Sequence, residues 1–384
     1  MASIATPPRG LPVSAPSRPA HIPPSPYCVP RAAPVLDEKM DMEMLDLDKI
    51  TLEDETKLKE NFSGESVFQM KVDWLDRQLR KLHTGDETPI KLEVDRNDIF
   101  FDSFRALSKC SGEQLRGPLQ VKFKREEGRD DGGLTRHWFM LISREVVNPA
   151  YAMFTLVGKR ECYQIHSASK HQSHYLDYFK FIGRVWGKAI YDGFLVESYF
   201  ASNIYKFILG REIELADLMS VDNVYYSSLT WFLENDIEEA ELEMVFELEE
   251  EDLGQIVKVP LREGGASCAV TNANKEEYVK LAVQHRLLGS IRPQLEALRA
   301  GFHEVMPAHI LKKFSEGELE LLLHGMPVID IEDWRANCEY RAGFSDDHEV
   351  VLWFWEIVGD WDQVARTHAR THARARAHTH HIGL

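Results

Sequence analysis

The sequence predicts a mostly helical α+β fold, and three patterns support this prediction. Apolar residues recur at helical spacing from Val67 to Leu82, which is typical of an amphipathic helix. The stretch from Tyr175 to Tyr191 is apolar on nearly every face, as expected for a helix buried in a large domain. Alternating residues predict strands at Leu119 to Phe123 and at Leu242 to Leu248, the second with glutamates on its wet face.

Two further helices carry signals at their first residues. Asn274 precedes Glu277 by three residues, and Ser315 precedes Glu318 in the same way. Each pair can therefore exchange side-chain and backbone hydrogen bonds in a capping box. Gly325 is expected to end the second of these helices, because glycine readily adopts the conformation that follows a helix.

A pair of glycines marks the predicted buried helix. Gly183 and Gly187 lie four residues apart and would let another element approach the helix backbone closely. The same spacing occurs where membrane helices dimerise. Lys180, Arg184 and Lys188 on the same stretch argue against a membrane span.

Charge and composition limit the classes of partner. The 384 residues carry a formal net charge of -17, whereas nucleic acid and anionic membranes require clustered Lys and Arg. A basic protein is therefore the expected partner, with no nucleic acid. The chain contains no apolar run of the roughly 18 to 20 residues that span a bilayer, and its N-terminus lacks the apolar core of a secretory signal. We expect an intracellular protein, in the cytoplasm or the nucleus.

The cysteines indicate a reducing compartment. They are few, widely spread and odd in number, which does not fit a disulfide framework. Their spacing also excludes a CxxC zinc site, and we expect neither a metal nor a cofactor. The five stand at positions 28, 110, 162, 268 and 338.

The first 62 residues fall into two segments of different composition. Residues 1–36 are rich in Pro, Ala and Ser and contain no acidic residue, so they are expected to be disordered. An organelle transit peptide is the alternative interpretation of this segment. Residues 37–62 form an acidic linker. Neither segment is long or apolar enough to form a domain that recognises a substrate, so protein substrates stay unknown.

The segment from Val121 to Phe139 reads VKFKREEGRDDGGLTRHWF and predicts a strand, a tight turn and an aromatic helix. Gly132 and Gly133 permit backbone angles that other residues avoid, and Asp130 can accept hydrogen bonds from the amides that follow it. Taken alone, this is the description of a structural turn.

Seven more blocks follow in order: NPAYAMF, YFKFIGRVWGKAIYDG, YYSSLTWFLEND, VTNANKEEYV, ELELLLHG, IDIEDW and WFWEIV. In this order they resemble the HECT domain of E3 ubiquitin-protein ligases, most closely the branch that bears WW domains. The resemblance covers roughly Val94 to Asp362, with departures at Arg129, which is usually apolar, and His137, which is usually acidic. It implies an N-terminal lobe at 63–340.

Within that lobe, the resemblance implies a small subdomain at about 217–292 that binds a ubiquitin-conjugating enzyme (E2) carrying ubiquitin as a thioester. The ligase's own cysteine then takes the ubiquitin and passes it to substrate lysines. The implied E2-binding groove consists of Leu229, Phe232, Leu242, Met244 and Tyr278. Periodicity alone would make about half of these ordinary core residues.

An acidic run accompanies the implied groove. Glu234 to Asp252 contains eleven acidic residues in nineteen and no basic one. Such a run is usually only a solvated face, but here it could steer a basic E2 towards the groove.

The resemblance also implies a second site, at which the ligase would bind the growing ubiquitin chain non-covalently. It matches Phe100, Phe101, Tyr151 and Leu253, where Leu253 replaces an expected aromatic residue. A surface of this kind requires an exposed apolar patch.

A flexible hinge to the C-terminal lobe is implied at Tyr340, Arg341, Ala342, Gly343 and Phe344, and residues 345–363 would form the first helix of that lobe. The family's nucleophilic cysteine lies in a Leu-Pro-x-small-x-Thr-Cys-Phe-Asn context that none of the five cysteines has. Cys162 lies beside Lys159 and Arg160, which could favour its thiolate, yet both Cys162 and Cys338 are interpreted as structural.

Residues 364–384 alternate Ala-Arg and Thr-His pairs where the rest of the C-terminal lobe is expected. The segment does not resemble folded protein, and we interpret the C-terminal lobe as truncated. Its histidines could alternatively bind a metal, although nothing in the segment would hold the ligands rigidly. They stand at positions 368, 372, 378, 380 and 381.

Three functions follow from these patterns. The first is a HECT-type ubiquitin transferase by family whose present chain binds E2 but is inactive in transfer. The second is a non-catalytic decoy or scaffold module that sequesters charged E2. The third is a protein that acts through its tail, by binding metal or as a scaffold, in which case the lobe is incidental.

Overall fold

A computed structural model of the chain describes residues 64–82, 88–128, 130, 132–158, 162–240, 242–252, 255–325, 335, 345 and 347–360. The chain divides into two compact units, Met1–Met70 and Lys71–Leu384, and the second holds nearly all of the described structure. The predicted segments at 1–36, 37–62 and 364–384 and the hinge at 340–344 lie outside the described residues. In the part of the chain that is described, no helix combines the length and apolarity that a membrane span requires.

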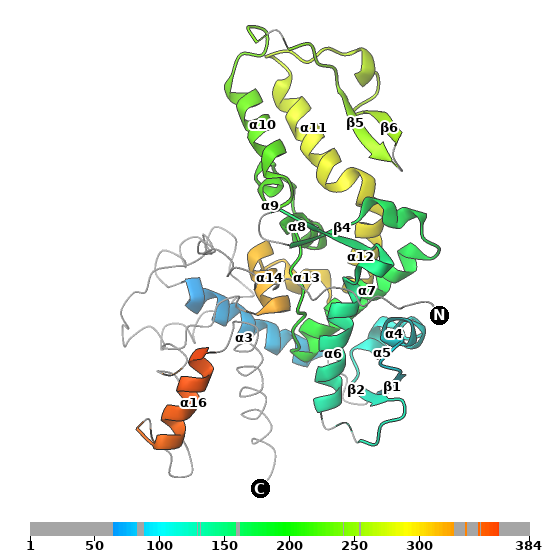
Figure 1. The fold of residues 1–384 in the computed structure, drawn as a ribbon, viewed down its shortest axis with the longest axis vertical. Helices are drawn as coiled ribbons and strands as arrows, with labels where there is room; N and C mark the ends of the chain where they lie inside the picture. Colours follow the sequence, from blue (N-terminus) through cyan, green and yellow to red (C-terminus); the bar gives the residue numbers. More distant parts are fainter. Residues whose placement is uncertain are drawn as a thin grey trace, which may run out of the picture. The chain divides into compact units, whose positions relative to one another are not determined.

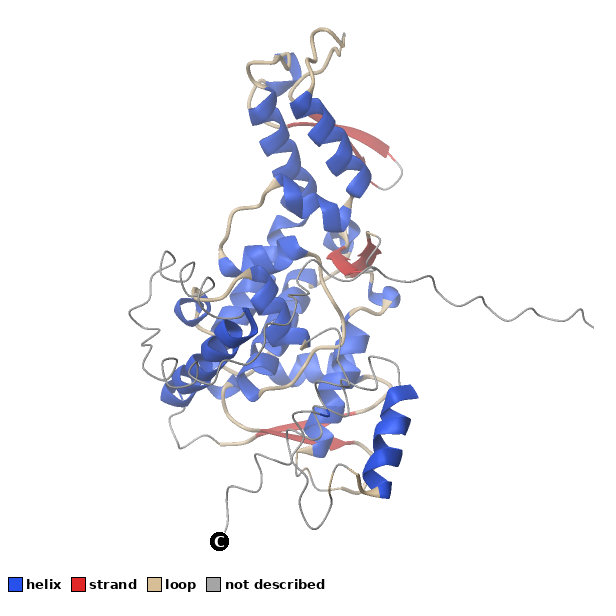
Figure 2. Ribbon diagram, turned by 90° about the vertical axis from the view of Figure 1, so that its left-hand side faces the viewer, coloured by secondary structure: helices blue, strands red, loops and turns tan. Residues whose placement is uncertain are grey.

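The described elements make a mostly helical α+β structure, as predicted (Figures 1 and 2). Helix α3 coincides with the predicted amphipathic helix and α7 with the predicted buried one. The α-helices are α3 (Gly64–Leu82), α4 (Ile99–Leu107), α5 (Gly112–Leu115), α6 (Gly133–Val146), α7 (Tyr175–Asp192), α8 (Ser202–Leu209), α9 (Leu218–Val221), α10 (Asn223–Glu234), α11 (Lys275–Leu288), α12 (Arg292–Val305), α13 (Ala308–Leu311), α14 (Glu316–His324) and α16 (Glu349–Asp360).

The strands form small two-stranded sheets. Strand β1 (Ile90–Val94) pairs in parallel with β2 (Leu119–Phe123), with α4 and α5 in the connection. Strand β3 (Phe154–Val157) pairs antiparallel with β4 (Cys162–Ile165), and β5 (Glu247–Asp252) pairs antiparallel with β6 (Gln255–Pro260). The prediction for Leu119 to Phe123 is confirmed.

The core is organised around α7 and α12, which lie side by side (Figure 1). A Cβ atom at Gly183 would overlap the carbonyl oxygen of Leu298 and lie 2.7 Å from the backbone nitrogen of Phe302. A Cβ atom at Gly187 would lie 2.8 Å from the carbonyl oxygen of Phe302. One at Gly301 of α12 would overlap the carbonyl oxygen of Lys180. The predicted close approach is therefore confirmed, and it is a contact between two helix backbones.

The turn before α6 forms as its sequence predicts. The Oδ1 atom of Asp130 accepts hydrogen bonds from the backbone N–H of Gly132 and of Thr135, at 2.9 and 3.3 Å. Its Oδ2 atom accepts from Val121 of β2 at 2.8 Å. Gly132 has a φ of 95°, a value that side chains disfavour. One carboxylate thus ties the strand to the start of the helix.

The two predicted capping boxes have different outcomes. Ser315 accepts a hydrogen bond from the N–H of Glu318 and Glu318 accepts one in return, so that box is confirmed, and Gly325 ends α14 with a φ of 74°. The box at Asn274 is wrong, although α11 begins beside it. Its Oδ1 atom turns back and accepts from the N–H of Thr271 at 2.7 Å, because the preceding turn competes for the side chain.

The predicted strand at Leu242 to Leu248 is also corrected. Strand β5 begins only at Glu247, and of the preceding residues Val245 makes an isolated bridge to Ala269. The segment before β5 is held instead by single hydrogen bonds, such as the one from Val270 N–H to the carbonyl of Met244 at 2.8 Å. The alternating pattern was right from Glu247 onward and wrong for the residues before it, which form single hydrogen bonds and no continuous strand pairing.

A buried hydrogen-bonded chain closes the C-terminal end of α14. His324 is 3% exposed, and its Nδ1–H donates to the carbonyl of Val196 at 2.8 Å. Its Nε2 accepts from the hydroxyl of Tyr205 at 2.7 Å, and that hydroxyl accepts from the N–H of Phe200 at 3.0 Å. Burial lowers the pKa of His324 to about 4. The neutral ring is therefore part of the native structure.

Candidate functional site

Described residues between 217 and 292, called the small subdomain below, include α10, α11 and the β5–β6 hairpin, which lie together in both views (Figures 1 and 2). Helix α10 starts where Asp222 accepts a hydrogen bond from the N–H of Tyr225 at 3.0 Å. The ring of Tyr278 lies 5.6 Å from the ring of Phe232 and 5.6 Å from that of Phe246. This aromatic cluster joins α10, α11 and the segment before β5.

The structure separates the five predicted groove residues into two groups. Leu229, Phe232 and Tyr278 are buried, at 4, 5 and 2% exposure, and belong to the core of the small subdomain. Leu242 is 39% exposed and Met244 is half-buried. The three core residues support the surface, whereas Leu242 and Met244 are available on it.

Sequence reasoning missed Trp231, which is 47% exposed at the end of α10. Val245 is also exposed, three residues after Leu242. At 100° per residue, Trp231 points away from the face shared by Leu229 and Phe232, so helical period alone could have separated it from them. An exposed aromatic residue of this kind is typical of binding surfaces.

The acidic segment around these apolar residues is locally ordered. Asp236 accepts hydrogen bonds from the side chain of Asn272 and from the N–H groups of Glu238 and Glu239, and these bonds, chiefly that from Asn272, lower the pKa of its carboxyl. Lys275 Nζ donates to the carbonyl of Asn235 at 2.6 Å. Residues 235–239 of the acidic run are thus fixed beside α10 and α11, and Glu238 and Glu239 are exposed.

The predicted non-covalent ubiquitin site is only partly exposed. Phe100 is 1% exposed and stacks on Tyr151 with ring centroids 4.9 Å apart. Phe101 meets Tyr151 edge-on at 5.6 Å, and both are half-buried. The hydroxyl of Tyr151 donates to Glu145 at 2.8 Å, and burial, followed by this bond, raises its pKa. Leu253 lies outside the described residues.

The described cysteines lie in structural contacts. Cys162 is 7% exposed, and its Sγ donates to the carbonyl of Ser220 at 3.6 Å. Burial raises the pKa of the Cys110 thiol. Arg262 donates to the sulfur of Cys268 at 2.9 Å. Cys28 and Cys338 lie outside the described residues, within which no group of three His, Cys, Asp or Glu side chains could hold a metal.

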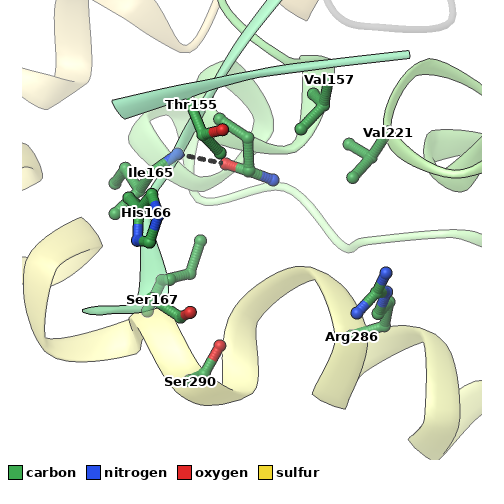
Figure 3. Close-up of a pocket in the computed structure, with 10 residues that line it drawn as sticks. Thr155, Val157, Ile165, His166, Ser167, Val221, Arg286 and Ser290 are labelled. Atoms are coloured by element: carbon green, nitrogen blue, oxygen red, sulfur yellow. Dashed lines mark hydrogen bonds between the residues drawn. The ribbon is translucent and has the colours of Figure 1, made fainter. Parts of the chain in front are cut away.

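A cavity of about 180 Å³ lies where the β3–β4 hairpin meets both ends of the small subdomain (Figure 3). Hydroxyls of Thr155, Ser167 and Ser290 share its lining with Val221 and Arg286. In Figure 3 these side chains come from the β3–β4 hairpin and the residues after it, from the end of α9, and from the end of α11 and the residues after it. No sequence pattern had marked it, because its walls come from three separate segments.

The contacts beside this cavity fix the junction. Arg286 Nη2 donates to the carboxylate of Asp222 at 2.9 Å, which joins α11 to the N-cap residue of α10. Gly158, in the β3–β4 turn, has a φ of 67°, and a Cβ there would overlap the carbonyl oxygen of Ser220. The hairpin therefore lies directly against α9, at the start of the small subdomain.

Comparison with known proteins gives a consistent family. The model of the HECT domain (ubiquitin-transferase) matches residues 140–368. Over 277 residues the chain is 42% identical to a TOM1-like E3 ubiquitin-protein ligase of Neurospora crassa, covering 72% of this chain and 7% of that protein. It is 40% identical to mouse HUWE1 over 300 residues, covering 78% and 7%, and 39% identical to rat NEDD4 over 296 residues, covering 76% and 33%. Both are E3 ubiquitin-protein ligases, and the chain spans a third or less of these relatives' lengths.

Proposed function

Because this chain belongs to the HECT-domain (ubiquitin-transferase) family, we propose that its small subdomain binds a ubiquitin-charged conjugating enzyme (E2). The observation that carries the proposal is the exposure of three apolar side chains in this subdomain, Trp231, Leu242 and Val245. Binding sites of standard size are built around a few apolar or aromatic side chains with a polar rim. Here the rim is the acidic run from Glu234 to Asp252.

The acidic rim has a separate role in the proposal. Carboxylates that surround an apolar contact raise the rate of encounter with a basic partner more than they raise affinity. A basic E2 surface is therefore attracted before the apolar side chains make contact. The effect should weaken as salt screens the charges.

For the transfer step we propose that this chain does not form a thioester with ubiquitin. Such a step needs a cysteine sulfur to attack the thioester carbonyl and the E2 thiolate to leave. None of the five cysteines has the sequence context of the family's nucleophile. The burial of Cys162 supports the same conclusion. The chain would then bind charged E2 without transferring its ubiquitin, with residues 340–344 as the hinge beyond the lobe.

The docking proposal is tested by E2 affinity, measured by titration calorimetry. Trp231→Ala and Leu242→Ala should each weaken binding by about tenfold or more, because each truncates an exposed apolar anchor. Val224→Ala is the matched control. Val224 is 78% exposed on the same helix, seven residues from Trp231 and about 10 Å away along the helix axis. Unchanged affinity in both Trp231→Ala and Leu242→Ala would overturn this placement of the site.

The transfer proposal is tested by mixing the chain with charged E2 and looking for a ubiquitin adduct that a reductant removes. We expect none. An adduct that disappears in Cys162→Ala, Cys268→Ala or Cys338→Ala would identify an active thiol and contradict the proposal.

The alternative function is a decoy that sequesters charged E2, and it makes the same prediction for binding and transfer. It differs in one outcome. A decoy should slow the transfer catalysed by an active ligase from the same E2, and the Trp231→Ala variant should not.

The non-covalent ubiquitin site is also a proposal, which Phe101 and Tyr151 would carry, since Phe100 is buried. Ubiquitin titrated into the Tyr151→Ala variant should bind more weakly than it binds to the unchanged chain. Equal binding would remove this site.

A further inference from the structure

We propose that a cavity between α8, α11 and α12 binds a phosphoryl dianion, either free or on a phosphorylated side chain. The cavity has a volume of about 240 Å³. This inference does not depend on E2 docking, since the cavity shares no residue with the exposed surface at Trp231 and Leu242. It is lined by Phe207, Gly210, Arg211, Glu212, Ile213, Gln284, Leu288, Arg292 and Arg299.

Three arginines converge on this cavity from two segments. Arg292 and Arg299 are seven residues apart in α12, so they lie on one face of the helix two turns apart. Arg211 comes from the turn that follows α8. Such a cluster is unexpected in a chain with a net charge of -17.

The arginines are held in place mainly by groups other than carboxylates. Arg211 donates to the carbonyl of Phe314 at 2.6 Å, and its other terminal nitrogen is 3.8 Å from Glu316. The guanidinium of Arg299 lies 4.7 Å above the ring of Phe207. Arg299 is thus positioned by an aromatic ring, and Arg211 by a carbonyl together with one carboxylate near the limit of ion-pair distance.

The remaining charges do not neutralise the cluster. Among the described residues that line the cavity, Glu212 is the acidic one, and its Oε1 atom is 2.6 Å from Lys280 Nζ. Arg292, at the first residue of α12, is exposed. Three guanidinium groups around one cavity repel one another, and an anion between them would relieve that repulsion.

The donors favour a phosphoryl group over a single carboxylate. A guanidinium offers a planar fork of N–H donors that matches two oxygens at once, and a phosphoryl group carries three acceptor oxygens with nearly two negative charges. The amide of Gln284 adds a neutral donor. Phe207, Ile213 and Leu288 form the apolar part of the lining, against which the carrier of the phosphoryl group would pack.

Calorimetric titration with inorganic phosphate and with N-acetyl-O-phosphoserine amide tests the proposal, at an ionic strength fixed with sodium chloride. We expect one site per chain, with no heat from the unphosphorylated N-acetylserine amide. Tighter binding of the phosphoserine compound would indicate that the ligand is a phosphorylated side chain. Tighter binding of inorganic phosphate would indicate that the ligand is a free anion. Failure of both compounds to bind would overturn the proposal.

Arg292→Gln should weaken binding of the better compound by about tenfold, because it removes one charged donor from an exposed position. Arg80→Gln, an exposed arginine of α3, is the matched control and should bind normally. Arg299→Gln should also weaken binding of the better compound, and thermal melting confirms that this variant is folded. Equal affinity in Arg292→Gln and Arg80→Gln would overturn the site. E2 affinity should be unchanged in Arg292→Gln, which separates this result from the docking proposal.

Discussion

The α7–α12 helix pair and the small subdomain bury apolar residues in different ways. In the helix pair the backbones themselves are in contact at Gly183 and Gly301, so there is no room for even one added carbon. In the small subdomain three aromatic rings hold two helices and the segment before β5 together, and apolar side chains stay on the surface.

This difference separates stability from binding. A contact between backbones cannot adjust, because the obstructing atoms are not at the end of a flexible side chain. A surface such as that of Trp231 and Leu242 can change without loss of the fold. Substitutions should therefore have their largest effects on stability in the helix pair, and their largest effects on binding in the small subdomain.

The sharpest test of the comparison is Gly183→Ala. The added Cβ would overlap the Leu298 carbonyl, so α7 and α12 must separate, and we expect a loss of about 4 kcal/mol or more in the free energy of unfolding. Gly317→Ala in α14 is the control, because a Cβ there meets nothing within 4 Å. It should stabilise the protein by about 0.5 to 1 kcal/mol. Urea denaturation measures both, and a loss under about 1 kcal/mol at Gly183 would break the comparison.

The next largest effect is a pH dependence of the free energy of unfolding, which comes from His324 at the end of α14. The pKa of His324 falls from 6.5 to about 4 in the folded state, so the unfolded chain binds the extra proton first as the pH decreases. Stability from this group is complete above pH 6.5 and declines down to pH 4, by about 3 kcal/mol in all. Urea denaturation at pH 7, 6 and 5 should show this slope. It should be reduced in His324→Gln, whose side chain cannot take up a proton, and an equal slope in the two proteins would contradict the assignment.

Within the small subdomain, Leu229→Ala and Val224→Ala distinguish core from surface on a single helix. Leu229 is 4% exposed and Val224 is 78% exposed. Loss of the buried side chain should cost about 2 to 3 kcal/mol in the free energy of unfolding, and loss of the exposed one less than about 0.5 kcal/mol. Thermal and urea denaturation measure the difference. Similar costs for both variants would mean that α10 does not bury the face described above.

The smallest expected effect concerns the start of α14. Ser315→Ala removes one side of the capping box with Glu318 and should cost about 1 kcal/mol. Ser227→Ala is the control, because its hydroxyl bonds the carbonyl of Asn223 on an exposed part of α10. That change should cost less than about 0.5 kcal/mol. A Ser315→Ala variant as stable as the control in urea denaturation would show that the box contributes little.

The elements that were predicted correctly depend on neighbours in the sequence. The predicted helix at Tyr175 to Tyr191, the strand at Leu119 to Phe123 and the box at Ser315 each follow from residues close together in the sequence. Asn274 has the same pattern as Ser315 and failed, since a second local donor, the N–H of Thr271, was in reach. Local patterns thus predict that a helix begins, but they do not predict which of two local bonds forms.

The candidate site shows the other limit. The sequence marked Leu229, Phe232, Leu242, Met244 and Tyr278 as apolar and belonging together, but it could not say which of them face the solvent. That depends on how α10 and α11 and the chain before β5 pack around Tyr278. Trp231 was missed for the same reason, since exposure is a property of the packed subdomain.

By itself, the sequence determined the fold class, the family and the positions of several helices, because periodicity, caps and ordered motifs are properties of neighbouring residues. Only the tertiary structure decided which apolar residues lie on the surface of the small subdomain and which arginines share one cavity. Arg211 and Arg299 are far apart along the chain, and their charges come together only because α8 and α12 pack against each other.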